Sequence, residues 1–183
     1  MTETGVVHGR FQIFHLDHLK YIQAARQRCS HLVIGITNPD PTLTRTDPAD
    51  PARSLPQANP LSYFERYTII REVMFEQGVD PAAFSIVPFP INIPELYRFY
   101  MPADAVFYLT IYDDWGKRKL QLLESLGLRV EVLWSRPFDK KGICAGKVRE
   151  CLAKGLEWEH MVTPAAASVM KKLRIPERLA NPG

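Results

Sequence analysis

A short apolar run, residues 5–9, leads through a tight turn into a helix that the apolar spacing predicts over residues 16–28. Two histidines, His15 and His18, stand in or just before the first turn of this helix, and side chains three residues apart share one helix face. The N–H groups and the dipole of a helix N-terminus attract an anion, and phosphate is the natural guest. A strand, turn and helix that present two imidazoles to a phosphate therefore constrain the fold more than any other stretch.

Two other interpretations of His15 and His18 stay open from the residues alone. Both side chains also suit a surface or capping position without any chemistry. A histidine pair also suggests zinc, but the nearest cysteine, Cys29, is remote in the sequence and no third ligand stands out. The Gly9-Arg10 pair at the preceding turn favours phosphate over both alternatives.

Downstream, segments of strand and helix character alternate along the chain. The strand-like runs are rich in β-branched and aromatic residues, and the segments between them have helical spacing. This alternation predicts an α/β fold with a doubly wound parallel five-stranded sheet, formed by residues 1–183 as one domain. After residues 5–9, the predicted strands cover residues 31–36, 83–87, 104–109 and 128–133. The main predicted helices cover residues 16–28, 59–77 and about 116–127, and Pro60 suits a first helical position. Small C-terminal helices are predicted at about 146–175.

Polar segments follow the ends of two predicted strands. Residues 39–60 are rich in Pro, Asp and Thr and have no periodicity, so they predict a long loop. Because this loop follows the carboxyl end of a strand, where open α/β sheets bind ligands, we interpret it as a lid or substrate loop. Asp113 and Asp114 follow a later strand; adjacent acids before a helix are typical caps, although they also suit a ligand or a metal.

Composition and charge exclude several classes of protein. No apolar run approaches the ~20 residues of a membrane span, so we expect no membrane association. A net charge of +3 is too small to indicate binding to a nucleic-acid polymer. Three scattered cysteines and an N-terminus without signal-peptide features lead us to expect a cytoplasmic protein. Basic residues cluster late in the chain around one acid, Asp139, in a pattern that suits a polyphosphate or a solvated face: Arg136, Lys140, Lys141, Lys147 and Arg149.

Residues 9–12, which read Gly-Arg-Phe-Gln, together with His15 and His18 resemble the signature of the nucleotidylyltransferase superfamily. The stretch is most similar to the pattern of the archaeal-type nicotinamide-nucleotide adenylyltransferases, G-R-F-Q-P-x-H-x-G-H. Here Ile13 stands at the proline position, and Asp17 stands at the glycine position between the histidines. Because that glycine lets a nucleotide approach the backbone closely, we expect Asp17 to shift the nucleotide or to change the accepted base.

Later segments agree with the same family in order, so the resemblance covers about residues 5–175. Residues 143–149 resemble the I-S-x-T-x-I-R motif, whose polar groups hold the β- and γ-phosphates in that family. Arg149 matches, whereas Cys144 and Gly146 replace the two hydroxyl residues. Cys144 also suggests a nucleophile, but no base is positioned with it in the sequence.

Two further segments align with the family. Residues 59–66 resemble the N-P-F-T-x-G-E-R stretch, with Phe64 at the glycine position. Residues 88–92 resemble P-x-P-D-I-N without its aspartate, and Tyr97 falls where the family has a tryptophan that stacks on the nicotinamide ring. We therefore expect an acceptor pocket that differs from that of the family.

The resemblance implies a Rossmann-like nucleotidylyltransferase that moves AMP from ATP to the phosphate of a mononucleotide such as nicotinamide mononucleotide, with Mg²⁺, and releases pyrophosphate. Assembly into a homo-oligomer is compatible with it. The implied catalytic residues are His15, His18 and Arg149. The implied nucleotide- and phosphate-binding residues are Gly9, Arg10, Phe11, Gln12, Cys144, Gly146 and Lys147, and the implied acceptor-binding residues are Asn59, Arg66, Asn92 and Tyr97; no protein ligand to a metal is implied.

Two alternatives to nicotinamide-nucleotide adenylylation stay open. The departures at Asp17, Phe64 and Tyr97 leave room for a cytidylyl- or adenylyltransferase with a different phosphate acceptor. The missing hydroxyl groups at Cys144 and Gly146 leave room for a non-catalytic nucleotide-binding sensor. Turnover separates the sensor from the two enzymes, and acceptor choice separates the enzymes from each other.

Overall fold

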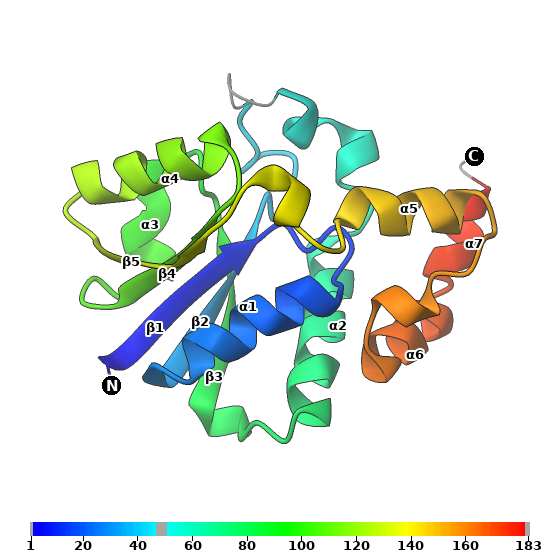
Figure 1. The fold of residues 1–183 in the computed structure, drawn as a ribbon, viewed down its shortest axis with the longest axis horizontal. Helices are drawn as coiled ribbons and strands as arrows, with labels where there is room; N and C mark the ends of the chain where they lie inside the picture. Colours follow the sequence, from blue (N-terminus) through cyan, green and yellow to red (C-terminus); the bar gives the residue numbers. More distant parts are fainter. Residues whose placement is uncertain (1, 47–50, 182–183) are drawn as a thin grey trace.

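The computed structural model describes residues 2–46 and 51–181. The strands of this part of the chain are β1 (Thr2–Gly9), β2 (Cys29–Thr37), β3 (Phe84–Phe89), β4 (Val106–Ile111) and β5 (Arg129–Ser135). They form one parallel sheet in the order β3-β2-β1-β4-β5 (Figure 1). The chain places β2 and β3 on one side of β1 and then β4 and β5 on the other. The predicted doubly wound, Rossmann-like α/β fold is confirmed.

Helices cover both faces of the sheet. They are α1 (Leu16–Arg26), α2 (Tyr63–Glu76), α3 (Tyr97–Tyr100), α4 (Asp114–Ser125), α5 (Ala145–Ala153), α6 (Pro164–Lys172) and α7 (Ile175–Ala180). In β1, Val7 packs into the core shared with α1 and α2, whereas Val6 packs into the core shared with α3 and α4. In β4, Tyr108 and Phe107 divide in the same way, because successive side chains of a strand point to opposite faces. In the described part of the chain, every helix is too short or too polar to span a bilayer.

The strands β1 and β4 are neighbours in the sheet although β2 and β3 come between them in the sequence. Gly5 and Val6 of β1 pair with Val106 and Phe107 of β4. At such a switch point the connections leave toward opposite faces and a crevice opens, which is where open α/β sheets bind ligands. Polar residues at the carboxyl ends of these two strands are therefore the first candidates for a site.

Helix α2 begins later than the sequence indicated. The predicted start was Asn59-Pro60, but Ser62 is the N-cap and Tyr63 is the first helical residue. The Ser62 hydroxyl accepts a hydrogen bond from the Glu65 N–H at 3.2 Å, and the Glu65 carboxylate accepts one from the Ser62 N–H at 2.8 Å. This capping box satisfies N–H groups at the helix start, which outweighs the preference of Pro60 for a first helical position.

The predicted loop over residues 39–60 contains two short 3₁₀ helices, η1 (Pro51–Ser54) and η2 (Pro56–Ala58). Residues 47–50 of the predicted loop lie outside the described residues. The Arg10 guanidinium donates a hydrogen bond to one carbonyl oxygen in each of η1 and η2, at 3.1 and 3.2 Å. The loop is thereby tied back to the turn after β1.

Arg66 of α2 is buried, with 1% of its surface exposed, and holds three chain segments together. Its guanidinium donates hydrogen bonds to the carbonyl oxygens of Thr37 (2.7 Å), Asn38 (2.8 Å) and Arg10 (3.0 Å). Burial lowers the pKa of Arg66 to about 10, so the group stays charged at neutral pH. A buried cation requires such a set of acceptors, and the planar guanidinium can satisfy several at once. The structure thus places Arg66 beneath the loops and not among ligand-facing side chains.

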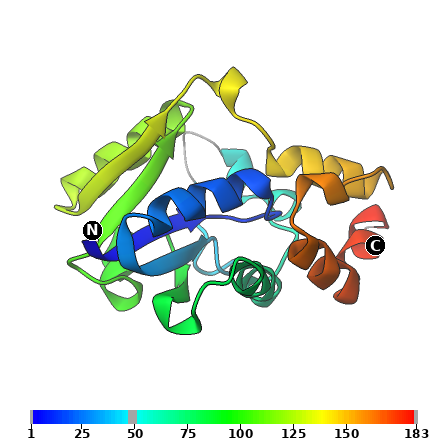
Figure 2. The same cartoon turned by 60° about the horizontal axis from the view of Figure 1, so that its bottom comes forward.

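The C-terminal helices α5–α7 form a group at the side of the sheet where α1 and α2 lie, and they reach slightly beyond the predicted range of about 146–175 (Figure 2). Arg178 of α7 donates a hydrogen bond to the Glu65 carboxylate of α2 at 2.6 Å. The Glu76 carboxylate at the other end of α2 accepts one from the Ala165 N–H at 2.8 Å. These contacts hold the group against α2, and α5 then meets the turn that follows β1.

Candidate active site

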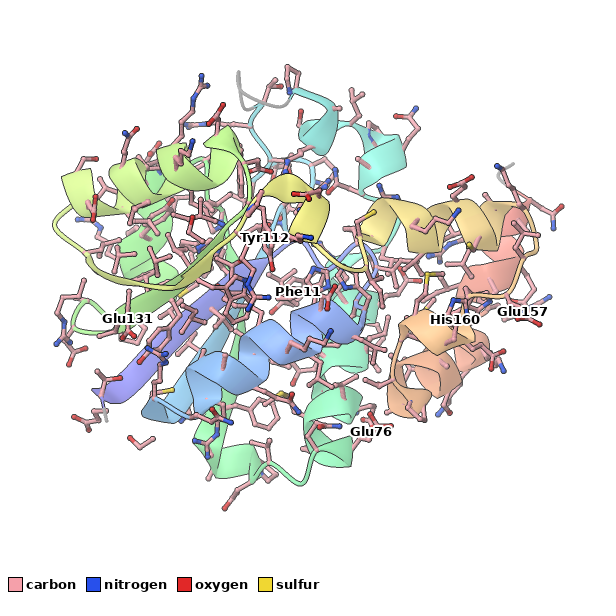
Figure 3. The ribbon with its side chains drawn as sticks, in the orientation of Figure 1. Phe11, Glu76, Tyr112, Glu131, Glu157 and His160 are labelled. Carbon is pink, nitrogen blue, oxygen red and sulfur yellow. The ribbon has the colours of Figure 1, made fainter. Side chains whose placement is uncertain are left out.

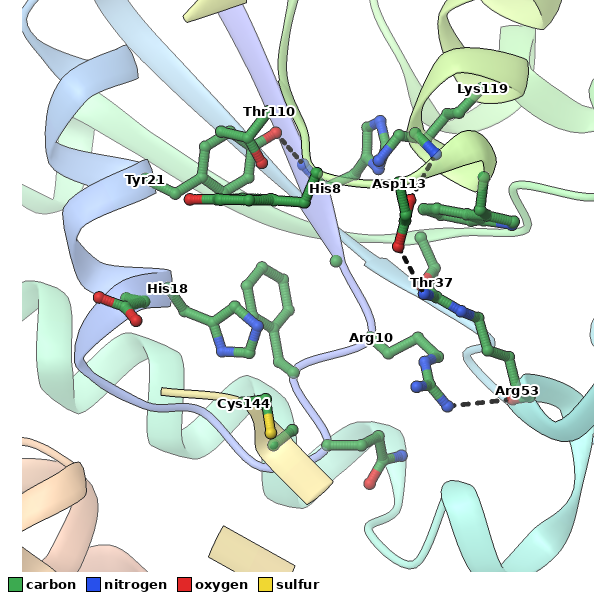
Figure 4. A pocket seen from close by; sticks show the side chains of 18 of the residues that line it. His8, Arg10, His18, Tyr21, Thr37, Arg53, Thr110, Asp113, Lys119 and Cys144 are labelled. Atoms are coloured by element: carbon green, nitrogen blue, oxygen red, sulfur yellow. Dashed lines mark hydrogen bonds and ion pairs between the residues drawn. The ribbon is translucent and has the colours of Figure 1, made fainter. Parts of the chain in front are cut away.

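A pocket with a volume of about 270 Å³ lies at the carboxyl edge of the sheet (Figure 4). Its walls come from the ends of β1, β2, β4 and β5, the N-termini of α1, α4 and α5, and the loop after β2. The pocket brings together most of the residues that the sequence implied for the site: His15, His18, Arg149, Gly9, Arg10, Phe11, Gln12, Cys144, Gly146 and Asn92.

The imidazole rings of His15 and His18 stack with their centroids 3.7 Å apart and their planes at 22°. His15 is the N-cap of α1, and His18 lies in the first turn. The Phe11 ring meets His18 edge-on, with a centroid distance of 5.0 Å. The Nδ1 atoms of both histidines are buried without a hydrogen-bond partner among the described residues. The rings are held by packing, and their Nδ1 atoms remain able to form a hydrogen bond to a ligand.

Burial lowers the pKa of His15 to about 4 and that of His18 well below its ordinary value. The Asp17 carboxylate opposes the shift for His15, whereas the positive charge of Lys141 lowers the pKa of both histidines further. Both imidazoles are therefore neutral at pH 7, and each has one N–H donor. A phosphate bound beside them would favour the protonated form and raise both pKa values.

Arg149 reaches the same pocket from α5. Its guanidinium donates a hydrogen bond to the carbonyl oxygen of Gln12, in the turn after β1. The side-chain amide of Gln12 donates to and accepts from the backbone of Leu61, at 2.8 and 2.9 Å. Lys147 is absent from the pocket walls and pairs with Glu150 at 3.2 Å, because side chains two positions apart on a helix point in different directions. Arg149, and not Lys147, therefore carries the positive charge of α5 into the site.

Asp17 fastens the segment that precedes α5. Its carboxylate accepts a hydrogen bond from the Ile143 N–H at 2.5 Å and pairs with Lys20 at 2.7 Å. A Cβ atom on Gly142 would lie 2.3 Å from this carboxylate, so the segment approaches α1 too closely for a larger residue unless the carboxylate moves. Asp17 also lines the pocket, so its hydrogen bond to Ile143 fixes the shape of the pocket wall.

Of the four implied acceptor-binding residues, Asn92 lines the pocket and the other three do not. Tyr97 is buried between α3 and the sheet, and its hydroxyl donates a hydrogen bond to the carbonyl oxygen of Ile91. Asn59 donates hydrogen bonds to two carbonyl oxygens of its own loop, at 2.7 and 2.9 Å. Together with Arg66, these side chains shape the loops around the site, because the fold already uses their polar groups.

The structure adds residues that the sequence did not single out. Lys119 lies four residues after Trp115 on one face of α4, but helical spacing alone does not tell whether that face meets a pocket. Asp113 caps α4 by accepting a hydrogen bond from the Gly116 N–H at 2.8 Å, as predicted, and it also lines the pocket. The added pocket residues include His8, Thr37, Asn38, Arg45, Arg53, Thr110, Tyr112, Trp115, Lys119 and Trp134. Several of them end a strand or directly follow one, so their position at the carboxyl edge of the sheet could have indicated that they line the pocket.

Residues 6–115 match the model of a known family, described as cytidylyltransferase-like. Among curated proteins, the chain is 48% identical over 176 residues to the phosphonoformate cytidylyltransferase of Streptomyces viridochromogenes, a match that covers 96% of this chain and 95% of that protein. It is 29% identical over 178 residues to the nicotinamide-nucleotide adenylyltransferase of Ignicoccus hospitalis, a match that covers 93% of this chain and 92% of that protein.

Solved structures share the fold. A bifunctional NMN adenylyltransferase/ADP ribose pyrophosphatase from Francisella tularensis matches 98% of this chain with a TM-score of 0.67 and 17% sequence identity. The match covers 52% of that protein, so this chain spans about half its length. The structural likeness supports the fold, and the family model and the sequence relatives confirm the predicted membership of the nucleotidylyltransferase superfamily. The chain is therefore a nucleotidylyltransferase that belongs to the cytidylyltransferase-like family.

Proposed function

We propose that this enzyme transfers CMP from CTP to a phosphonate or phosphate oxygen of a small acceptor, with phosphonoformate as the first candidate. The observation that carries the proposal is the 48% identity to a phosphonoformate cytidylyltransferase along almost the whole chain. The pocket supports it, because two neutral imidazoles, a guanidinium and the N-termini of α1 and α5 meet there. The adenylylation of nicotinamide mononucleotide becomes the second candidate.

The proposed reaction is a displacement at the α-phosphorus of CTP. An oxygen of the acceptor phosphonate forms a bond to the α-phosphorus, and the bond from the α-phosphorus to the oxygen bridging to the β-phosphorus breaks. The electron pair leaves with pyrophosphate, so the step requires no nucleophile from the enzyme, and Cys144 has no covalent role. Catalysis of this kind rests on positioning and on the stabilisation of charge.

We assign His15 and His18 to the α-phosphate. Negative charge accumulates on its non-bridging oxygens in the transition state, and the N–H donors of the stacked rings would stabilise that charge. Burial keeps the free rings neutral, and it also strengthens hydrogen bonds to a bound phosphate because water is excluded. Since the ring centroids are 3.7 Å apart, we expect the two rings together to gain at most one proton.

We assign the β- and γ-phosphates to Arg149, the backbone after β1 and the first turn of α5. Cys144 is the N-cap of α5, and its side chain makes no capping hydrogen bond, which leaves N–H groups of that turn to a ligand. The resemblance implied Lys147 for this role. We assign the additional positive charge to Lys141 instead, because Lys141 lines the pocket and its charge acts on both histidines.

Mg²⁺ is expected to arrive as part of the nucleotide substrate. Within residues 2–46 and 51–181, no three His, Cys, Asp or Glu side chains are grouped to hold a metal ion. On the pocket wall, Asp17 accepts a hydrogen bond from the backbone, and Asp113 caps α4 and lies 3.7 Å from Arg53. Because Mg²⁺ binds mainly through substrate phosphates and water, this pocket is compatible with Mg²⁺–CTP. A related structure from Francisella tularensis holds AMP and a manganese ion.

The second candidate is adenylyl transfer from ATP to nicotinamide mononucleotide. One observation favours it, since Asn92, the asparagine of the segment that resembles P-x-P-D-I-N, lines the pocket. The position of Tyr97 disfavours it. Tyr97 is 6% exposed and its hydroxyl is bonded to the backbone, so its ring is not available to stack on a nicotinamide.

Pyrophosphate release with Mg²⁺ tests both candidates. The purified protein is assayed with CTP or ATP as donor and with phosphonoformate, nicotinamide mononucleotide or nicotinate mononucleotide as acceptor. We expect release from CTP with phosphonoformate and none from CTP alone. Release that requires ATP and a mononucleotide would replace the first candidate by the second. No release from any combination, while CTP still binds in calorimetry, would contradict both and favour the sensor.

A further inference from the structure

The pocket has a second end that the transfer step leaves unassigned. It lies where β1 ends and α4 begins, on the opposite side of the pocket from Cys144 and toward the top and right of Figure 4. Three side chains that can bind an anion stand there: Lys119, Arg53 and His8, which we call the distal cluster.

The distal cluster places two cations on one aromatic ring. The guanidinium carbon of Arg53 lies 4.2 Å from the centroid of the Trp115 ring, and Nζ of Lys119 lies 4.4 Å from the same centroid. The face of a tryptophan attracts each cation, but the two cations repel one another. An anion between them would remove that repulsion, as an acidic ligand does at other arginine and lysine sites.

One carboxylate, that of Asp113, acts on both cations. Asp113 lies 3.7 Å from Arg53, and among the described residues it is the one whose charge raises the pKa of Lys119. Burial has the larger effect and, with the charges of Arg53 and Lys141, lowers the pKa of Lys119 to about 7. The environment of Lys119 therefore favours the binding of a further negative group.

His8 adds an independent sign of a missing partner. Its side chain is 4% exposed and lines the pocket, and its Nε2 atom is buried without a hydrogen-bond partner among the described residues. The residue is held in place, since its backbone N–H donates to the Tyr21 hydroxyl at 3.4 Å and its ring lies against Phe89. Buried polar atoms are nearly always paired, so an unpaired nitrogen on a pocket wall indicates a ligand.

We propose that the distal cluster binds a second acidic group of the acceptor, a carboxylate carried next to the phosphonate that attacks CTP. The inference rests on the proposed function, because it names the part of the acceptor that the same pocket recognises. Arg53 and Lys119 would supply charged N–H donors, and Nε2 of His8 would supply one further hydrogen bond.

The charge of one lysine, Lys141, acts on both ends of the pocket. The charge of Lys141 acts on His15 and His18 at one end and on Lys119 at the other, so Lys141 lies within electrostatic reach of both. Because both ends belong to one pocket, we place the phosphonate of the acceptor near the histidines and its carboxylate at the distal cluster. An acceptor that presents an uncharged group to the distal cluster would lose the attraction that Arg53 and Lys119 exert on an anion.

The test compares phosphonoformate with methylphosphonate, in which a methyl group replaces the carboxylate. For the wild-type protein we expect kcat/KM with CTP to be about 100-fold or more higher for phosphonoformate. Lys119→Met should lower kcat/KM for phosphonoformate by about 30-fold or more, mainly through KM, and change that for methylphosphonate less than about twofold. Lys119→Arg, which keeps the charge, should restore much of the preference.

Lys117→Met is the matched control, because Lys117 lies on the same helix, is exposed and pairs with Asp114 outside the pocket. This variant should keep the wild-type preference. If circular dichroism shows that Lys119→Met does not fold, Arg53→Met replaces it in the test, with the same expected results. An equal loss of kcat/KM for both acceptors, or no loss for either, would overturn the proposed role of the distal cluster. The proposal of cytidylyl transfer would still stand.

A wild-type protein that releases no pyrophosphate with any phosphonate would contradict the proposed function itself. Calorimetry with phosphonoformate as the probe then tests the inference alone. Weaker binding of phosphonoformate to Lys119→Met than to the wild type would support the distal cluster. Equal binding to both proteins, or no binding to the wild type, would overturn it.

Discussion

The carboxylate of Asp17 accepts a hydrogen bond from the backbone N–H of Ile143, which lies 126 residues later in the chain. The contact joins the N-terminus of α1, which carries the histidine pair, to the segment that enters α5, which carries Arg149. Two helix N-termini that both line the pocket are thus held by one side chain. The residue that departs from the family pattern at its glycine position therefore has a clear structural role.

Replacing Asp17 by alanine should weaken nucleotide binding more than it weakens the fold. Without the carboxylate, the Ile143 N–H loses its partner and the segment before α5 is free to move. We expect KM for CTP to rise about tenfold, the size of one lost charge-assisted hydrogen bond. Asp17→Asn keeps an acceptor oxygen and should stay within about threefold of the wild type. Unchanged KM in Asp17→Ala would contradict this role.

Arg149 and Lys147 form a matched pair on one helix. Arg149→Gln should lower kcat/KM for CTP by about 100-fold, because a guanidinium that reaches the pocket is lost. Lys147→Gln removes the same charge from α5, but its ammonium pairs with Glu150 outside the pocket, so activity should change less than about twofold. Steady-state pyrophosphate release measures both. Similar losses in the two variants would show that net charge matters and position does not.

Removal of the His18 ring should reduce catalysis far more than stability. We expect His18→Ala to lower kcat by about 100- to 1000-fold, because a donor to the α-phosphate is lost. The ring also packs against Phe11 and Phe14, so the free energy of unfolding should fall by about 2 kcal/mol. The control is His160→Ala, because His160 is exposed on the C-terminal helical group, far from Phe11 (Figure 3). Near-normal kcat in His18→Ala would refute the assigned mechanism.

Stability should fall as pH decreases from about 7 to about 4. Burial lowers the pKa of His15 to about 4 in the folded protein, whereas an unfolded histidine titrates near 6.5. Between these values the unfolded chain binds more protons, so acid favours unfolding, by about 3 kcal/mol in total for His15. Urea unfolding at pH 7 and pH 5 should show a smaller loss for His15→Gln than for the wild type. Equal losses in the two proteins would show that His15 is not buried in its neutral form.

Arg66→Lys should destabilise the protein although it keeps the positive charge. Lysine cannot reproduce the fork that donates to Thr37, Asn38 and Arg10, so buried carbonyl oxygens lose partners. We expect the free energy of unfolding to fall by about 3 kcal/mol. Arg71→Lys is the control, because Arg71 lies on the same helix, is partly exposed and pairs with the adjacent Glu72. Equal stability in Arg66→Lys and the wild type would mean that the guanidinium bonds contribute little.

The sequence by itself determined the fold class and the position of the histidine pair in the pocket. Alternating strand and helix patterns are local, and they predicted the five parallel strands to within a few residues. His15 and His18 could be placed together because both stand at the start of one helix, a position readable from spacing. The start of α2 was misplaced, since the reciprocal bonds of Ser62 and Glu65 outweighed the signal from Pro60.

Only the tertiary structure decided which charged side chains face the pocket. Spacing along a helix separates its faces, but packing against the sheet selects the face that meets the ligand, so Lys119 was missed and Lys147 was included. Tyr97 was assigned by its place in a motif, yet the core buried it. The bond from Asp17 to the backbone before α5 joins distant segments. Contacts of this kind depend on how whole helices and strands pack together, so no local pattern in the sequence predicts them.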